Sequence, residues 1–395
     1  MHQLVSANLD TSRRWWVLAI VVAAQFMFGV DAFVVNVAIP TIAAELHAST
    51  AEIESVIAIY LIAYATLIVT GGRLGDIYGT KGVFLAGVFG FTLTSLWCGL
   101  AQSGPELIAA RLAQGATAAL MVPQVPRRAG TRLDVPGAIV LFIGLLCLIG
   151  PLLFGHDVHW APWVWLVMAA GLAIVAALVR LERTVARRGG MPLIDLTLLS
   201  DRPFMRGLCA TFLFFFANLS FYLVMTLFMQ KALAIPPLKA GMVFVPLALT
   251  FVIASRHSGM RAKHRGTYVL IEGCAVQILG LAALALTVAS VQAPAAWLLA
   301  LVLMVFGYGQ GLVMAPLSST VLSTVKPASA GSGSGIYGTT AQIGNAAGVA
   351  AIGAVFFAIE ATDSSQHALF ASLAMFTLSI AACAAFLSWM RHAAA

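Results

Sequence analysis

The sequence predicts an all-α integral membrane protein, and three observations support this prediction. Of the 395 residues, 61% are hydrophobic and only 9% are charged, whereas a soluble domain carries roughly a quarter charged residues. The mean hydropathy is +0.96. The apolar residues gather in runs of about 20, the length that crosses a bilayer as a helix. A soluble enzyme, a nucleic-acid module, a disordered chain and a disulfide scaffold are excluded, because too few charges are present to cover a water-facing surface.

Twelve apolar runs are long enough to span the membrane as helices. Period-two alternation of apolar and polar residues, which marks transmembrane strands, is not found in them. The five cysteines all lie within these runs, which argues against a disulfide framework. The runs are residues 15–39, 53–72, 82–102, 105–125, 134–154, 161–181, 204–230, 239–256, 267–289, 295–318, 337–359 and 367–390.

The positions of Lys and Arg predict the orientation, since cytoplasmic loops carry an excess of both. If every run spans and the N-terminus is cytoplasmic, 19 of the 22 basic residues fall on the cytoplasmic side and 2 on the outer side. We therefore expect both termini in the cytoplasm and a multi-pass protein of the cell inner (cytoplasmic) membrane. The net charge of +7 then reflects topology and not a nucleic-acid site.

Asp31 is the most informative residue, because it is a carboxylate inside the first predicted helix. It stands about eight residues before Ile39, which places it roughly 12 Å deep at 1.5 Å per residue. A carboxylate at that depth costs about 3 kcal/mol to insert and usually faces a cavity or the bundle interior. Such a group suits a proton carrier, and helix packing or capping is the structural alternative.

Arg111 is a second charge within an apolar run. It follows Pro105 by about six residues, so it lies roughly 9 Å deep on the same side as Asp31. Because the two depths are similar, we expect an ion pair or a water-bridged pair, which lowers the cost of burying both charges. Protonation of Asp31 would break this pair and favour another helix packing. A purely structural pair is the alternative.

Residues 72–82, with the sequence GRLGDIYGTKG, are predicted to form the cytoplasmic loop between the second and third helices. Glycine permits a tight turn and a close approach of helices. A carboxylate here can accept hydrogen bonds from a helix N-terminus, while basic residues anchor the loop at the membrane surface. The residues concerned are Gly72, Arg73, Gly75, Asp76, Gly79 and Lys81.

Four motifs in separate parts of the chain resemble the major facilitator superfamily, and within it the fourteen-helix drug:proton antiporter branch. Residues 72–82 resemble its signature loop, with Thr80 where a basic residue is common. Residues 31–40, DAFVVNVAIP, resemble the first-helix signature, with Phe33 in place of the usual Thr. Residues 111–119, RLAQGATAA, match the fourth-helix pattern R-x-x-Q-G-x-x-x-A. Residues 331–342 resemble the loop before the penultimate helix.

The resemblance implies major facilitator-type helical bundles and a role for each matched residue. Asp31 would be the proton-linked carboxylate, and Arg111 its proton-transfer or gating partner. Asp76 with Arg73 would latch the two halves in one access state. No metal or cofactor is implied, because a proton gradient drives such transporters. Candidate cavity residues are Asn36, Gln114 and Asn218, with helix packing as the alternative for Asn36 and Asn218.

The chain departs from that branch in having twelve predicted helices instead of fourteen. Residues 121–125 resemble the end of the fourth helix, yet residues 126–134, which resemble the exit from the sixth, follow at once. We therefore expect the fifth and sixth helices of the branch to be missing. The expected parts are an incomplete N-terminal transmembrane bundle over residues 1–126, two central linker helices with a cytoplasmic linker over 127–200, and a C-terminal six-helix bundle over 201–395.

These observations predict a proton-coupled secondary transporter that exports amphipathic or cationic drugs by alternating access. An enzyme is not expected, since no nucleophile–base or metal-ligand constellation is found in the sequence. The alternatives are a metabolite exporter or permease on the same scaffold and a transport-defective deletion variant. The expected partners are a small-molecule substrate, protons and the lipid bilayer, with no nucleic acid. A membrane-fusion protein and an outer-membrane efflux channel are further partners that the resemblance admits.

Overall fold

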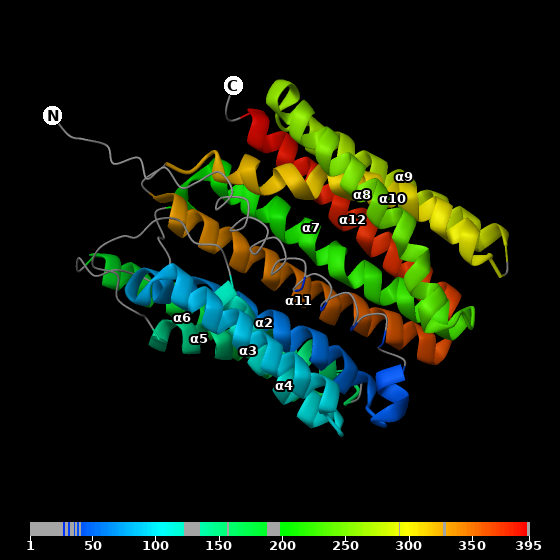
Figure 1. Ribbon diagram of the computed structural model, residues 1–395, viewed down its shortest axis with the longest axis horizontal. Helices are drawn as coiled ribbons and strands as arrows, with labels where there is room; N and C mark the ends of the chain where they lie inside the picture. The colour runs from blue at the N-terminus through cyan, green and yellow to red at the C-terminus, as the bar shows by residue number, and fades with distance from the viewer. Residues whose placement is uncertain are drawn as a thin grey trace.

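The computed structural model describes residues 27, 31, 35, 38, 41–121, 135–155, 158–187, 198–291, 293–326 and 329–392. In this part of the chain the regular structure is entirely helical (Figure 1). The α-helices are α2 (Thr50–Tyr78), α3 (Thr80–Leu100), α4 (Gly104–Ala118), α5 (Val135–Phe154), α6 (Pro162–Arg187), α7 (Arg202–Leu227), α8 (Pro237–Arg265), α9 (Tyr268–Ser290), α10 (Ala296–Leu322), α11 (Ala330–Thr362) and α12 (Ser365–His392), with single turns at η1 (Ala119–Met121), η2 (Leu198–Ser200) and η3 (Phe228–Ala232).

Among the described helices, nine are long and apolar enough to cross a membrane, namely α2, α3 and α6 to α12. The apolar stretch of α5, Pro136–Leu152, is shorter, and α4 has 15 residues before it tightens into η1. Eleven of the twelve predicted runs therefore coincide with helices. Most of the first run, residues 15–39, lies outside the described residues. The orientation of the termini stays a prediction.

Local capping explains where several helices begin. Ser49 and Glu52 form a capping box at the start of α2, in which Ser49 Oγ accepts from the Glu52 amide at 3.2 Å and Glu52 Oε2 accepts from the Ser49 amide at 2.7 Å. This arrangement satisfies two amides that a helix N-terminus leaves without partners. Asp201 caps α7 in a similar way, since its Oδ1 accepts from the Phe204 amide at 3.1 Å.

Two loop predictions were wrong. Residues 72–82 do not form a loop, because α2 continues to Tyr78 and α3 begins at Thr80. Only Gly79 lies between them, with φ of 98°, a conformation that glycine adopts without a steric penalty. The glycine- and serine-rich segment 331–335 is also helical, since α11 begins at Ala330. There Gly333 packs close to Val325, so packing overrides a low helix propensity.

The helices form two groups that meet along α11. Helices α7 to α10 and α12 lie on one side of α11, and α2 to α6 lie on the other (Figure 1). Within the first group α10 packs on α8 and α9, while α7 packs on α11 and α12; within the second, α4 packs on α2 and α3. Helix α11 packs along α2. Helices α5 and α6 form a hairpin whose α5 contacts both α2 and α11, so the hairpin lies against the seam between the groups.

Candidate functional site

The Asp31 carboxylate is held by two side chains of α4. Arg111 Nη1 donates to Asp31 Oδ2 at 2.6 Å, and Gln114 Nε2 donates to Asp31 Oδ1 at 2.8 Å. The expected ion pair between Asp31 and Arg111 is therefore present as a direct contact. Arg111 and Gln114 are fully buried, whereas the Asp31 side chain is 17% exposed. The carboxylate is thus the part of this cluster that water or a ligand can reach.

Arg111 has partners on three sides. Its Nε donates to the backbone carbonyl of Val56 on α2 at 3.3 Å. Its guanidinium carbon lies 4.1 Å from the centroid of the Tyr60 ring, a distance at which a cation is attracted by the face of the ring. Its Nη1 also donates to Gln114 Oε1. These contacts fix the guanidinium against α2, so Arg111 keeps partners when the charge of Asp31 changes.

Gln114 extends the cluster to α3. Its Nε2 also donates to Ser95 Oγ at 2.7 Å, and Cys98 Sγ lies 3.6 Å from its Oε1. The side chain therefore joins Asp31, Arg111 and α3 in one network. Networks of this kind are strong in a low-dielectric interior when all their members have partners. Through the Gln114 amide, a change at Asp31 in the first helix therefore affects both α4 and α3.

A second polar cluster lies in the other helical group. Gln310 on α10 donates through Nε2 to Asn218 Oδ1 on α7. Its Oε1 accepts from the Tyr222 hydroxyl at 2.8 Å. All three groups are uncharged, so this cluster can bind a polar ligand or hold helices together, but it does not take up protons near neutral pH. Of these two clusters, the one around Asp31 is the one that contains a carboxylate.

The other predicted site residues fall into three groups. Asn218 lies in the second cluster and not beside Asp31. In the 72–82 segment, Gly75 is buried, Gly79 forms the turn and Lys81 is exposed. Outside the described residues and side chains lie Asn36, Gly72, Arg73 and Asp76. The latch expected from Arg73 and Asp76 therefore stays a prediction.

Several residues of both clusters were missed from the sequence, namely Ser95, Tyr60, Tyr222 and Gln310. A signal for Gln310 was available, because the dipeptide Gln-Gly occurs within both α4 and α10. In each case the glycine packs tightly on a neighbouring helix. A Cβ on Gly115 would lie 3.0 Å from Ala63 Cβ, and one on Gly311 would lie 2.9 Å from Ala254 Cβ. The repeated dipeptide thus marks equivalent places in the two halves.

The phenylalanines of α7 mostly serve packing. Phe221 stacks on Phe306 with ring centroids 4.0 Å apart and meets Phe376 edge-on at 5.6 Å. Phe214 is buried and meets Phe215 edge-on. Phe212 differs, because it lines a cavity between the two helical groups.

Comparison with known proteins identifies the family. The family model for the Major Facilitator Superfamily matches residues 21–349. The cephamycin export protein CmcT of Amycolatopsis lactamdurans is 30% identical, with 87% of this chain and 85% of the relative aligned. The probable actinorhodin transporter of Streptomyces coelicolor is 29% identical, covering 88% of this chain and 73% of the relative. These relatives are named as transporters and not as enzymes.

A solved structure supports the same fold. The crystal structure of a bacterial homologue of the human lysosomal transporter Spinster, in an inward-facing and occupied conformation, superposes with a TM-score of 0.64 at 13% identity. The match covers 97% of this chain and 98% of the other. This likeness shows the fold, and the family match shows that the chain belongs to the Major Facilitator Superfamily of transporters.

Proposed function

We propose that this transporter exports small amphipathic or cationic molecules in exchange for protons. The observation that carries the proposal is the Asp31 carboxylate, which is held by buried Arg111 and Gln114 and is itself 17% exposed. An ionisable group within membrane-spanning helices commonly belongs to a proton or substrate pathway. A carboxylate that water can reach and that α4 holds through two hydrogen bonds suits this role.

Coupling would follow from competition for one negative charge. Protonation of Asp31 removes the charge that Arg111 and Gln114 bind, which weakens the contact between the first helix and α4. Arg111 then keeps Gln114, the Val56 carbonyl and the face of Tyr60, so its own burial stays compensated. A cationic substrate near Asp31 would favour the ionised carboxylate, whereas a proton would exclude that substrate. If this competition takes place in both the inward-open and the outward-open conformation, the protein exchanges protons for substrate.

The names of relatives support export as the direction. Besides CmcT, they include the puromycin resistance protein pur8 of Streptomyces alboniger, at 24% identity, and the multidrug resistance protein Stp of Mycobacterium tuberculosis, at 28% identity. Resistance and export both require outward movement of a small molecule. The inferred substrate class rests on these names and on the Asp31 carboxylate. A metabolite exporter on the same scaffold would use the same cluster.

A second candidate is a transport-defective deletion variant, and one observation favours it. The alignment with the actinorhodin transporter extends over 430 positions, although this chain has 395 residues. The alignment with CmcT extends over 423 positions. Both relatives therefore contain residues that have no counterpart between the matched parts of this chain. The inferred loss of the fifth and sixth helices of the branch would account for this difference.

The test is proton movement in inverted membrane vesicles that contain equal amounts of each protein variant. We expect a cationic dye to release protons from energised vesicles with the unchanged chain and not with Asp31→Asn. Asp363→Asn is the matched control, because Asp363 is an exposed carboxylate paired with His367 at the end of α11. Proton release that persists in Asp31→Asn would refute the role of Asp31. If none of the three proteins releases protons although each is folded and inserted, the result would favour a transport-defective deletion variant.

A further inference from the structure

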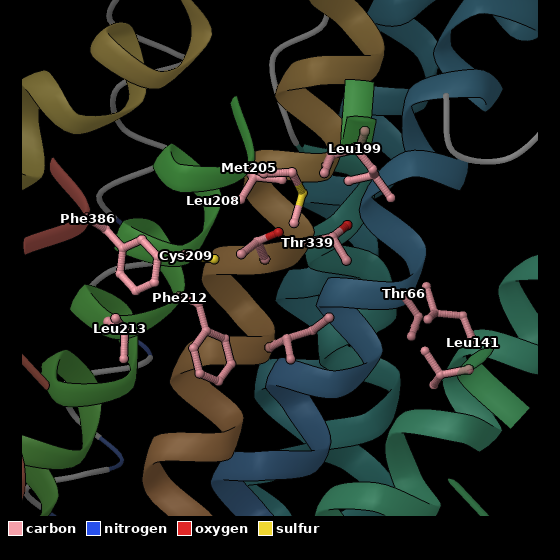
Figure 2. A pocket seen from close by; sticks show the side chains of 14 residues that line it. Thr66, Leu141, Leu199, Met205, Leu208, Cys209, Phe212, Leu213, Thr339 and Phe386 are labelled. Carbon is pink, nitrogen blue, oxygen red and sulfur yellow. The ribbon is translucent and has the colours of Figure 1, made fainter. Parts of the chain in front are cut away.

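A cavity of about 500 Å³ lies between the two helical groups, and none of its lining residues belongs to the Asp31 cluster. Residues of α2, α5 and α6 line one side, and residues of η2, α7, α11 and α12 line the rest. In Figure 2, Thr339 of α11 lies between Cys209 and Phe212 of α7 and the pair Thr66 and Leu141 of α2 and α5. The volume of the cavity suits a drug-sized molecule or a single aliphatic chain.

The lining suits an apolar occupant. No charged side chain lines the cavity within the described residues. The Thr66 hydroxyl donates to the carbonyls of Ile62 and Ala63, both at 3.0 Å, and the Thr339 hydroxyl donates to the Ala65 carbonyl at 3.0 Å. These two threonines therefore have satisfied hydroxyls. A charged group placed here would lose its hydration without compensation, so the cavity does not suit the charged part of a cationic substrate.

A basic residue continues the α7 face that lines the cavity. Met205, Leu208, Cys209 and Phe212 line the cavity with the spacing of a single helix face. Arg202 precedes Met205 by three residues, so it continues this face by one turn. Its side chain is exposed and stands in the first turn of α7. An apolar cavity on one helix face, with an exposed guanidinium one turn further along that face, matches an amphiphile with a negative head.

We propose that the cavity binds one acyl chain of an anionic membrane phospholipid, with the phosphate held near Arg202. The lining helices α2, α6, α7, α11 and α12 all carry candidate membrane spans, so phospholipid is the molecule most abundant around them. Basic sites between membrane helices are known to hold phospholipid head groups. The neutral lining and the terminal cation together favour a lipid over a free cationic compound.

The bound chain would touch both helical groups. On one side it contacts Thr66 of α2 and Leu141 of α5, and on the other Phe212 of α7 and Ile343 of α11. Motion of one group against the other changes the space between these residues. The lipid therefore stabilises the arrangement described here, because a ligand shifts an equilibrium toward the state that it contacts better. This inference does not depend on proton exchange or on the exported substrate.

The experiment uses the whole 395-residue chain in vesicles of phosphatidylcholine. The vesicles contain a trace of phosphatidylglycerol with a photoreactive diazirine in one acyl chain. After irradiation, mass spectrometry of peptides locates the adducts. We expect enrichment on two segments, residues 205–213 and 336–343. Equal labelling of the exposed faces of α8 and α9, without that enrichment, would overturn the proposal.

Variants separate the acyl and head-group parts. Cys209→Phe or Thr340→Phe fills the cavity and should abolish the enrichment, whereas Leu249→Phe on the exposed face of α8 should not. Two cavity variants are used so that a folding failure of one leaves the test intact. Unchanged labelling in both filled variants, each eluting as a single species, would refute the cavity as the lipid site.

Arg202→Gln should lower phosphatidylglycerol labelling about fivefold, the factor expected for one basic residue near a membrane surface. Arg256→Gln is the control, because Arg256 is exposed on α8, a helix that does not line the cavity. Equal labelling by the phosphatidylcholine analogue, together with no effect of Arg202→Gln, would refute the anionic head group. Protection of both segments by a transported dye would reassign the cavity to substrate.

Discussion

Gln114 and Gln310 occupy equivalent places in the two halves of the transporter. Each is buried within a helix, and each is followed by a glycine that packs against a neighbouring helix. Gln114 donates to Asp31 in the N-terminal half, and Gln310 donates to Asn218 in the C-terminal half. The halves of this family are related as parallel repeats. Each glutamine therefore links its helix to another by a side-chain hydrogen bond. The acceptor is the Asp31 carboxylate in one half and the Asn218 amide in the other.

Replacing either glutamine tests this equivalence. Gln114→Leu should abolish the dye-driven proton signal. Asp31 then loses one of its two hydrogen bonds, and Ser95 of α3 loses its hydrogen bond to α4. Gln310→Leu should leave coupling to Asp31 intact. Each change should cost about 0.5–2 kcal/mol of stability, the range for hydrogen bonds between membrane helices. Thermal unfolding in detergent measures the cost, and loss of proton coupling in Gln310→Leu alone would reverse the assignment.

The Asp31–Arg111 pair should show strong coupling in a double-mutant cycle. Arg111→Met alone leaves the Asp31 carboxylate, which is only 17% exposed, without its cation and should destabilise the protein by up to about 3–5 kcal/mol. Asp31→Asn combined with Arg111→Met should recover most of that stability, because no uncompensated charge remains. Transport should stay absent in both. Melting temperatures of the four proteins check the cycle, and additive losses would mean that the pair contributes little.

Close packing of α10 on α8 should make Gly311 intolerant of larger side chains. A Cβ at this position would press on the Phe251 carbonyl and on Ala254, so Gly311→Ala should lower stability by about 1–3 kcal/mol. Gly259 on α8 provides the control, because a Cβ there meets open space. Gly259→Ala should stabilise by about 0.5–1 kcal/mol, as expected when alanine replaces glycine within a helix. Thermal unfolding of both variants shows whether the signs are opposite.

Glu106 should contribute a small acid-sensitive contact between α3 and α4. The Gln102 amide donates to its carboxylate at 2.9 Å and the Trp97 indole donates at 3.2 Å, which lowers the pKa of Glu106 below its ordinary value of 4.5. Its contribution is therefore present above pH 4.5 and is lost as the pH falls through the lowered pKa. A melting curve measured against pH should lose this acid dependence in Glu106→Gln. If Glu106→Gln leaves the fall of the melting temperature at acid pH unchanged, the contact does not contribute to stability.

Hydropathy was sufficient to predict most of the fold, because a membrane helix must bury a long apolar stretch. Depth along two helices was likewise sufficient to predict the contact of Asp31 with Arg111. The role of Gln114 as the link to α3 was not predictable, since an amide gives no depth or charge signal. The turn at Gly79 was missed because a run of glycines and charges resembles a loop, although one residue with positive φ suffices to reverse the chain.

The position of α5 against both α2 and α11 has a consequence for biosynthesis. Helices α2 and α5 leave the ribosome long before α11, yet α11 covers the face that they share. Until residues 330–362 are inserted, that face must be shielded by lipid or by an insertion factor. A chain that stops before this point would present an unfinished surface to membrane proteases. The penultimate helix thus completes the first half of the protein as well as its own.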